Sequence, residues 1–99
     1  MIAARETWIL KKDCTQQALE LAQAERERVN AAGTPITARY YIPITGPRDV
    51  LVFESEWESL EARNKWYDEW GATPEAQAFY EKWVTLQERG GTHELWHVS

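Results

Sequence analysis

Apolar and polar residues follow two different spacings along this chain. Four stretches have the alternating or continuously apolar pattern of strands, at residues 5–10, 36–44, 49–55 and 92–98. Three others repeat apolar residues at helical spacing, at residues 14–30, 57–70 and 74–89. Asp13 and Gln16 suit the start of the first helix, Gly33 and Gly71 suit helix ends, and Thr73 followed by a proline suits a new helix start.

The predicted order is strand, helix, strand, strand, a helix broken in two, and strand. This is the β-α-β-β-α-β order of a ferredoxin-like α+β fold, with a four-stranded antiparallel sheet and helices on one face. With 99 residues, the chain has the length of one domain covering residues 1–99.

The predicted sheet is apolar on both faces. In the second strand Ile36, Tyr40 and Ile44 point one way, while Arg39 and Tyr41 point the other. The third strand contains the continuous apolar run at 50–53. Helices cover only one face, and a large exposed apolar face marks an interface. We therefore expect a homodimer whose sheets pack face to face, with Arg39 and Tyr41 on the dimer face.

The order of elements, the two-faced sheet, the aromatic segment at 53–62 and the tail Glu94-Leu95-Trp96 resemble the dimeric α+β barrel superfamily. This superfamily includes NIPSNAP proteins and antibiotic-biosynthesis-type monooxygenases. The resemblance implies a homodimeric barrel, and among its activities a cofactor-independent oxygenation or isomerisation of an aromatic substrate. Haem-degrading members depend on a first-strand asparagine and a helical histidine, and this chain has neither.

Six tryptophans stand out in so short a chain, and four of them fall between residues 57 and 83. On the helix predicted at 57–70, Trp66, Tyr67 and Trp70 share one face with Arg63 in its middle. A guanidinium there can stack on an indole or bind a carboxylate. These four residues are the predicted ligand-binding wall. The alternative is that the rings only pack and that Arg63 extends past them to water.

Three residues are candidates for catalysis: Glu25, His93 and His97. Glu25 lies on the apolar face of the first helix and could approach Arg63. His93 and His97 share one face of the last strand, and either could act as a general base. Their separation of about 13 Å is too long for one metal ion. The alternative for each histidine is a hydrogen-bonded residue of an edge strand or dimer face.

Charge and cysteine content narrow the class of protein. The net charge of −5 disfavours a nucleic-acid partner, and no apolar run has the length of a membrane span. The single cysteine, Cys14, excludes an intrachain disulfide and favours a reducing compartment, so we expect a cytoplasmic protein. No ligand spacing for a metal and no phosphate-binding glycine loop is present, so we expect neither metal nor cofactor.

Two functions remain open. The first is a homodimer that binds a small aromatic or apolar molecule in an aromatic-lined cleft, with monooxygenase-like chemistry. The alternative is a non-catalytic NIPSNAP-like binding or assembly module in which the tryptophans only pack the core. The space beside Trp66 and Trp70 distinguishes them: an open cavity with a polar group favours the first, and ordinary core density favours the second.

Overall fold

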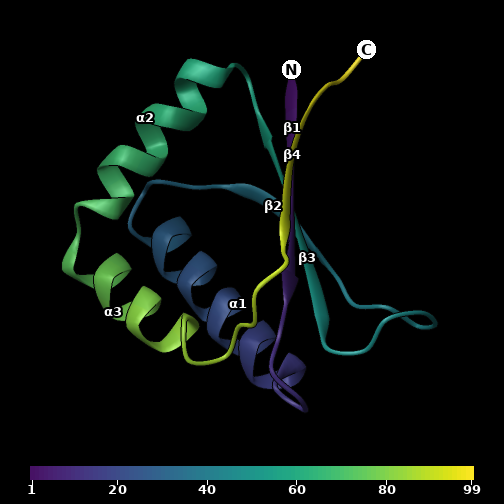
Figure 1. Cartoon of the computed structure of the whole chain (residues 1–99). Helices are drawn as coiled ribbons and strands as arrows, with labels where there is room; N and C mark the ends of the chain where they lie inside the picture. Colours follow the sequence, from purple (N-terminus) through teal and green to yellow (C-terminus); the bar gives the residue numbers. More distant parts are fainter.

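The computed structural model describes the whole chain, residues 1–99. Its elements follow in the order β1 (Ile2–Ile9), α1 (Thr15–Ala31), β2 (Thr37–Tyr41), β3 (Val50–Trp57), α2 (Leu60–Gly71), α3 (Pro74–Trp83) and β4 (Thr92–His97). The strands form one antiparallel sheet in the order β2-β3-β1-β4, which is the ferredoxin-like order. All three helices lie on one side of this sheet (Figure 1). The predicted α+β fold is confirmed.

The strand register decides which side chains face the helices. In β1 the helix-facing residues alternate through Ala4, Glu6 and Trp8, because successive side chains of a strand point to opposite faces. Glu6 lies opposite Phe53 of β3 on one side and opposite His93 of β4 on the other. Directly opposite residues share a face, so these three side chains lie on the helix side of the sheet.

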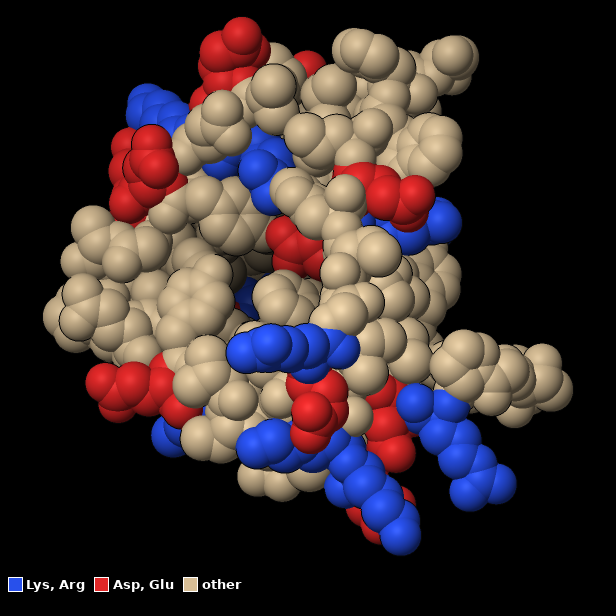
Figure 2. Space-filling model, viewed as in Figure 1, with Lys and Arg blue, Asp and Glu red and all other residues tan.

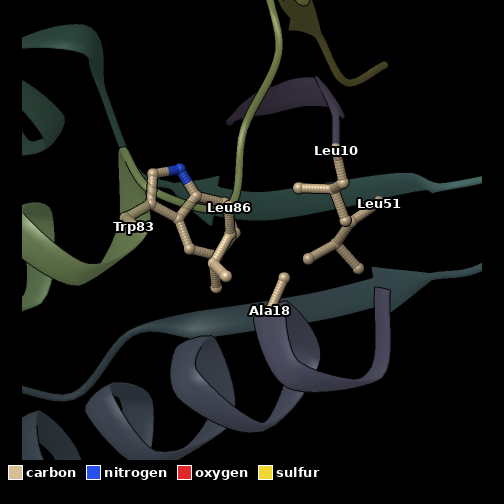
Figure 3. Packing of buried hydrophobic residues seen from close by; sticks show 5 residues of the cluster. All are labelled: Leu10, Ala18, Leu51, Trp83 and Leu86. Carbon is tan, nitrogen blue, oxygen red and sulfur yellow. The ribbon is translucent and has the colours of Figure 1, made fainter. Parts of the chain in front are cut away.

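Two apolar clusters hold the helices to the sheet. The first consists of five buried residues, drawn in Figure 3: Leu10, Ala18, Leu51, Trp83 and Leu86. The second consists of four: Ala4, Val29, Ile36 and Trp57. The clusters join α1 and α3 to the middle of the sheet. By contrast, α2 has no buried residue and lies against the second cluster through half-buried aromatic rings.

Several predicted helix ends are confirmed by their capping contacts. The hydroxyl of Thr73, predicted as a helix start, accepts a hydrogen bond from the first turn of α3. Ser59 caps α2 in the same way, although the sequence interpretation placed the start of that helix at residue 57. Gly33 has φ +86° just beyond α1, the left-handed conformation that ends helices. The predicted cap at Asp13 was wrong: Cys14 holds the N-cap position without a side-chain hydrogen bond, and Asp13 has φ +64°.

Three predicted elements extend beyond the helices and strands that the structure has. The strand β2 ends at Tyr41, and Ile42 and Ile44 are exposed in the loop that follows. Trp57 is the last residue of β3 rather than the first of a helix, and its indole is buried. The last helix ends at Trp83 instead of continuing to residue 89. None of the three helices has the length and apolar character needed to cross a membrane.

Candidate functional site

A cavity with a volume of about 90 Å³ lies between the helices and the sheet. Figure 2 shows it as a hollow between the helical layer and the sheet, with acidic atoms beside it and basic atoms within it. Nine aromatic residues line it: Trp8, Tyr40, Phe53, Trp66, Tyr67, Trp70, Phe79, Tyr80 and Trp83. Charged side chains are few in the lining and comprise Glu6, Glu25 and Arg26.

The aromatic wall comes from two helices packed end to end. Trp66 and Trp70 of α2 stack at 5.6 Å between ring centroids, and Phe79 and Trp83 of α3 stack at 5.4 Å. Trp70 also contacts Phe79 at 5.8 Å, which connects the two stacks. Aromatic pairs in such arrangements stabilise each other beyond simple burial. The cavity therefore has a continuous aromatic wall.

The indole N–H groups of Trp66 and Trp70 have partners, as buried indoles require. Trp70 donates to Oε2 of Glu25 over 2.7 Å, and Trp66 donates to the carbonyl of Thr34 over 3.2 Å. These bonds fix the orientation of both rings. The two bonds therefore connect the α2 side of the wall to α1 and to the segment that follows α1.

Glu6 brings a carboxylate into the cavity from β1. Its side chain is 20% exposed, and its nearest cationic atom is Nη2 of Arg63, 3.5 Å from Oε1. Burial raises the pKa of Glu6, and the neighbouring His93 and Arg63 offset this only in part. The carboxylate is therefore poorly stabilised in its charged form, as is typical of residues that bind ligands or transfer protons.

Arg63 and His93 lie beside Glu6. Nη2 of Arg63 is 3.1 Å from Nε2 of His93, which lies 4.0 Å from Oε1 of Glu6. Since a guanidinium can only donate, the contact requires an unprotonated Nε2 on His93. The guanidinium also lies over the ring of Tyr67, with 4.7 Å from Cζ to the ring centroid, and its Nε is buried without a partner.

Three tyrosines border the same space. Burial raises the pKa of Tyr67 strongly, and the charge of Glu6 raises it further. The pKa of Tyr40 and that of Tyr80 are also raised by burial. The hydroxyl of Tyr40 donates to the carbonyl of Ala22. The raised pKa values keep all three phenols in the neutral form, and the phenol of Tyr40 acts as a hydrogen-bond donor.

Glu25 is held differently from Glu6, although both line the cavity. Arg28 donates two hydrogen bonds of 2.8 Å to its two oxygens. Those bonds and the bond from Trp70 lower the pKa of Glu25 despite partial burial. The hypothesis that Glu25 pairs with Arg63 was wrong: the ion pair of Arg63 is with Glu6, and that of Glu25 is with Arg28.

The remaining predicted residues lie elsewhere. His97 is exposed near the end of β4, opposite Ile2, and has no contact with the Arg63 cluster. Arg39 and Tyr41 lie on the sheet face that the helices leave uncovered, where the Tyr41 hydroxyl donates to Glu54 over 3.4 Å. Their contact with a second subunit stays a prediction. No three histidine, cysteine or carboxylate side chains converge as a metal site would require.

Glu6 is the site residue that the sequence interpretation missed. The signal was available, because Ala4, Glu6, Trp8 and Leu10 occupy alternate positions and three of the four are apolar. Extending the strand pattern to the start of the chain places a carboxylate on the inward face. The prediction began the strand at residue 5, which hid this alternation.

Comparison with solved structures identifies proteins of the same fold. A NIPSNAP domain protein from Burkholderia xenovorans has a TM-score of 0.83 and 16% identity, over 100% of this chain and 95% of that one. A NIPSNAP family protein of unknown function from Agrobacterium tumefaciens has a TM-score of 0.81 and 21% identity, over 97% of this chain and 86% of that one.

A putative antibiotic biosynthesis monooxygenase from Nitrosomonas europaea has a TM-score of 0.73 and 9% identity, over 99% of this chain and 98% of that one. No family model and no curated protein matches the sequence. The expected fold likeness to NIPSNAP and antibiotic-biosynthesis-monooxygenase proteins is therefore confirmed. At these identities the likeness concerns the fold, which does not determine a function.

Proposed function

We propose that this protein binds a small apolar or aromatic molecule in the cavity between α2, α3 and the sheet. The observation that carries this proposal is the open space beside Trp66 and Trp70, with an incompletely paired carboxylate, that of Glu6, in its lining. Were these rings only packing a core, neighbouring side chains would fill that space.

The size of the cavity limits the ligand. Ligand pockets for drug-sized molecules measure about 300–1,000 Å³, and a cavity of about 150 Å³ takes up benzene. A cavity of about 90 Å³ that opens to the surface suits one ring whose edge projects into the mouth. A fused polycyclic molecule would be too large without movement of the wall.

Tryptophan fluorescence tests this function directly, because four of the six tryptophans line the cavity. We expect saturable changes on titration with single-ring compounds such as toluene and phenol, and none with sugars or amino-acid mixtures. A Trp66→Ala variant should lose most of the response. Absence of any saturable change across single-ring compounds would contradict the proposal and favour the non-catalytic packing module.

A monooxygenase-like reaction is a second candidate. Proteins named as antibiotic biosynthesis monooxygenases share the fold, and Glu6 next to His93 provides a proton acceptor inside the cavity. Without a cofactor, the substrate itself must supply the electrons that reduce the second oxygen atom to water. Oxygen uptake with easily oxidised ring compounds tests this, and Glu6→Gln should abolish uptake without abolishing binding.

We also propose that a second copy of the chain covers the helix-free face of the sheet, which Figure 1 shows bare. The register places Val52, Tyr41 and Trp96 on this face, and Trp96 is 54% exposed. Such a surface is typical of an interface. Light scattering should give twice the chain mass, and Trp96→Glu should shift the protein toward the monomer.

A further inference from the structure

We propose that the ligand of the cavity is a single-ring phenol whose hydroxyl donates a hydrogen bond to the carboxylate of Glu6. This inference rests on the ring-binding function proposed above and specifies the chemistry of the ligand. It starts from a contrast among the three carboxylates that pair with arginines in this protein, those of Glu6, Glu25 and Glu54.

Two of these carboxylates are fully engaged and one is not. Glu54 receives hydrogen bonds of 2.9 and 2.6 Å from Arg5, and Glu25 receives two of 2.8 Å from Arg28. Glu6 has only the guanidinium of Arg63 at 3.5 Å and the imidazole of His93 at 4.0 Å, both beyond ordinary hydrogen-bond geometry. The Trp8 indole favours the charged form slightly, but no well-formed hydrogen bond reaches Glu6. Its oxygens therefore have unused acceptor capacity inside the cavity.

The charges around the cavity favour a neutral donor over an ion. Three guanidiniums lie in or beside it: Arg26 in the lining, Arg28 on Glu25, and Arg63 on Glu6. Glu6 and Glu25 lie in the lining, each beside one of these guanidiniums, so a charged ligand of either sign meets a like charge there. A neutral O–H that donates to Glu6 satisfies the carboxylate without adding charge.

The geometry of the wall favours an aromatic carrier for that hydroxyl. Stacked aromatic pairs from α2 and α3 form one side of the cavity, and nine aromatic residues line it in all. Tyr40 and Tyr67 already hold the guanidiniums of Arg26 and Arg63 on their faces. A flat ring fits against the remaining aromatic surface, while its hydroxyl points at β1.

A comparison of phenol with toluene, its near-isostere, isolates the hydroxyl. A purely apolar cavity prefers toluene, because burying a hydroxyl without a partner is costly. A hydrogen bond to a charged acceptor reverses this order, and we expect phenol to bind about tenfold more tightly than toluene. Calorimetric or fluorescence titration of the full chain with each compound, near neutral pH, measures the dissociation constants of phenol and toluene.

The matched variants are Glu6→Gln and Glu54→Gln, which make the same change on opposite faces of the sheet. We expect Glu6→Gln to reduce the phenol preference severalfold, Glu6→Met to reverse it, and Glu54→Gln to leave it intact. If Glu6→Met fails to fold, Glu6→Gln still gives the answer. Tighter binding of toluene to the unmodified protein, or a phenol preference that survives both Glu6 substitutions, overturns the inference while ring binding stands. Binding of neither compound overturns the proposed function as well.

Discussion

The Nη2 atom of Arg63 lies 3.5 Å from Oε1 of Glu6, and this ion pair joins α2 to the middle strand β1. Helix α2 has no buried residue, so its position depends on this pair and on its aromatic side chains. The same pair leaves Glu6 incompletely stabilised, because burial raises its pKa more than His93 and Arg63 lower it. A structural contact and the proposed ligand-binding group therefore share one carboxylate.

This arrangement predicts that Glu6 destabilises the fold at neutral pH. A carboxyl whose pKa is raised by folding is harder to ionise in the folded state than in the unfolded state, so stability falls as pH rises through the range between the two pKa values. We expect Glu6→Gln to raise the thermal midpoint at about pH 7.5 relative to the unmodified protein. At about pH 4 the two should differ little, since Glu6 is then largely protonated in both states. A lower midpoint for the variant at neutral pH would show that the pair with Arg63 dominates instead.

Glu25 gives the opposite prediction from the same cavity. Arg28 and Trp70 lower its pKa, so its contribution to stability is present above the unfolded value of about 4.5 and is lost as pH falls through the folded pKa. We expect Glu25→Gln to lower the thermal midpoint at neutral pH, and the loss to shrink on acidification. Circular dichroism melts across this range test both glutamates side by side. If both substitutions changed the thermal midpoint in the same direction and with the same pH dependence, the carboxylates of Glu6 and Glu25 would not differ in their pairing.

The fold could be predicted from the sequence because its signals are local. Thr73 marks a helix start by its own hydroxyl, and Gly33 marks a helix end by its conformational freedom. The alternation in β2 separated Tyr40 from Tyr41 correctly, one toward the helices and one away. Each of these features depends on a few neighbouring residues, and such information is present in one sequence.

The candidate site was predictable only in part, because it depends on how α2 lies over the sheet. The helical spacing placed Arg63 with Trp66, Tyr67 and Trp70, and three of these four do line the cavity. The partner of Arg63 could not be derived in this way. Glu25 and Glu6 were both inward-facing carboxylates, and only the placement of α2 above β1 selects Glu6.

The indole of Trp70 should contribute more to stability than that of Trp66. Trp70 donates to a carboxylate over 2.7 Å, whereas Trp66 donates to a neutral carbonyl over 3.2 Å. Hydrogen bonds to charged groups contribute about 1.5–3 kcal/mol, and neutral ones about 0.5–1.5 kcal/mol. We expect Trp70→Phe to cost about 1 kcal/mol more than Trp66→Phe in urea unfolding. Equal costs would mean that the bond to Glu25 adds nothing beyond ring packing.

Gly91 is required where the chain enters β4. A Cβ at this position would lie 2.6 Å from the carbonyl oxygen of Thr7, a backbone atom that cannot move without disturbing β1. We expect Gly91→Ala to cost about 1–3 kcal/mol of unfolding free energy, as overpacking does. Gly71→Ala is the control, since a Cβ there meets nothing within 4 Å at the end of a helix. That change should be neutral or stabilising by about 0.4–1 kcal/mol.

Leu51 connects the stability of the core to the size of the cavity. It is fully buried in the first apolar cluster (Figure 3) and also lines the cavity, so Leu51→Ala removes core packing and enlarges the space at once. We expect a loss of about 2–5 kcal/mol, whereas Leu60→Ala, at a residue 41% exposed, should stay within about 0.5 kcal/mol.

The enlarged cavity of the Leu51→Ala variant should also accept a ring more readily. A ligand that binds only the folded state stabilises it in proportion to the logarithm of its concentration over its dissociation constant. We therefore expect toluene to raise the thermal midpoint of Leu51→Ala more than that of the unmodified protein. The midpoint of Leu60→Ala should rise by the same amount as that of the unmodified protein. An equal rise in all three proteins would place the ring outside the cavity, because Leu51 lies in the cavity wall and Leu60 does not.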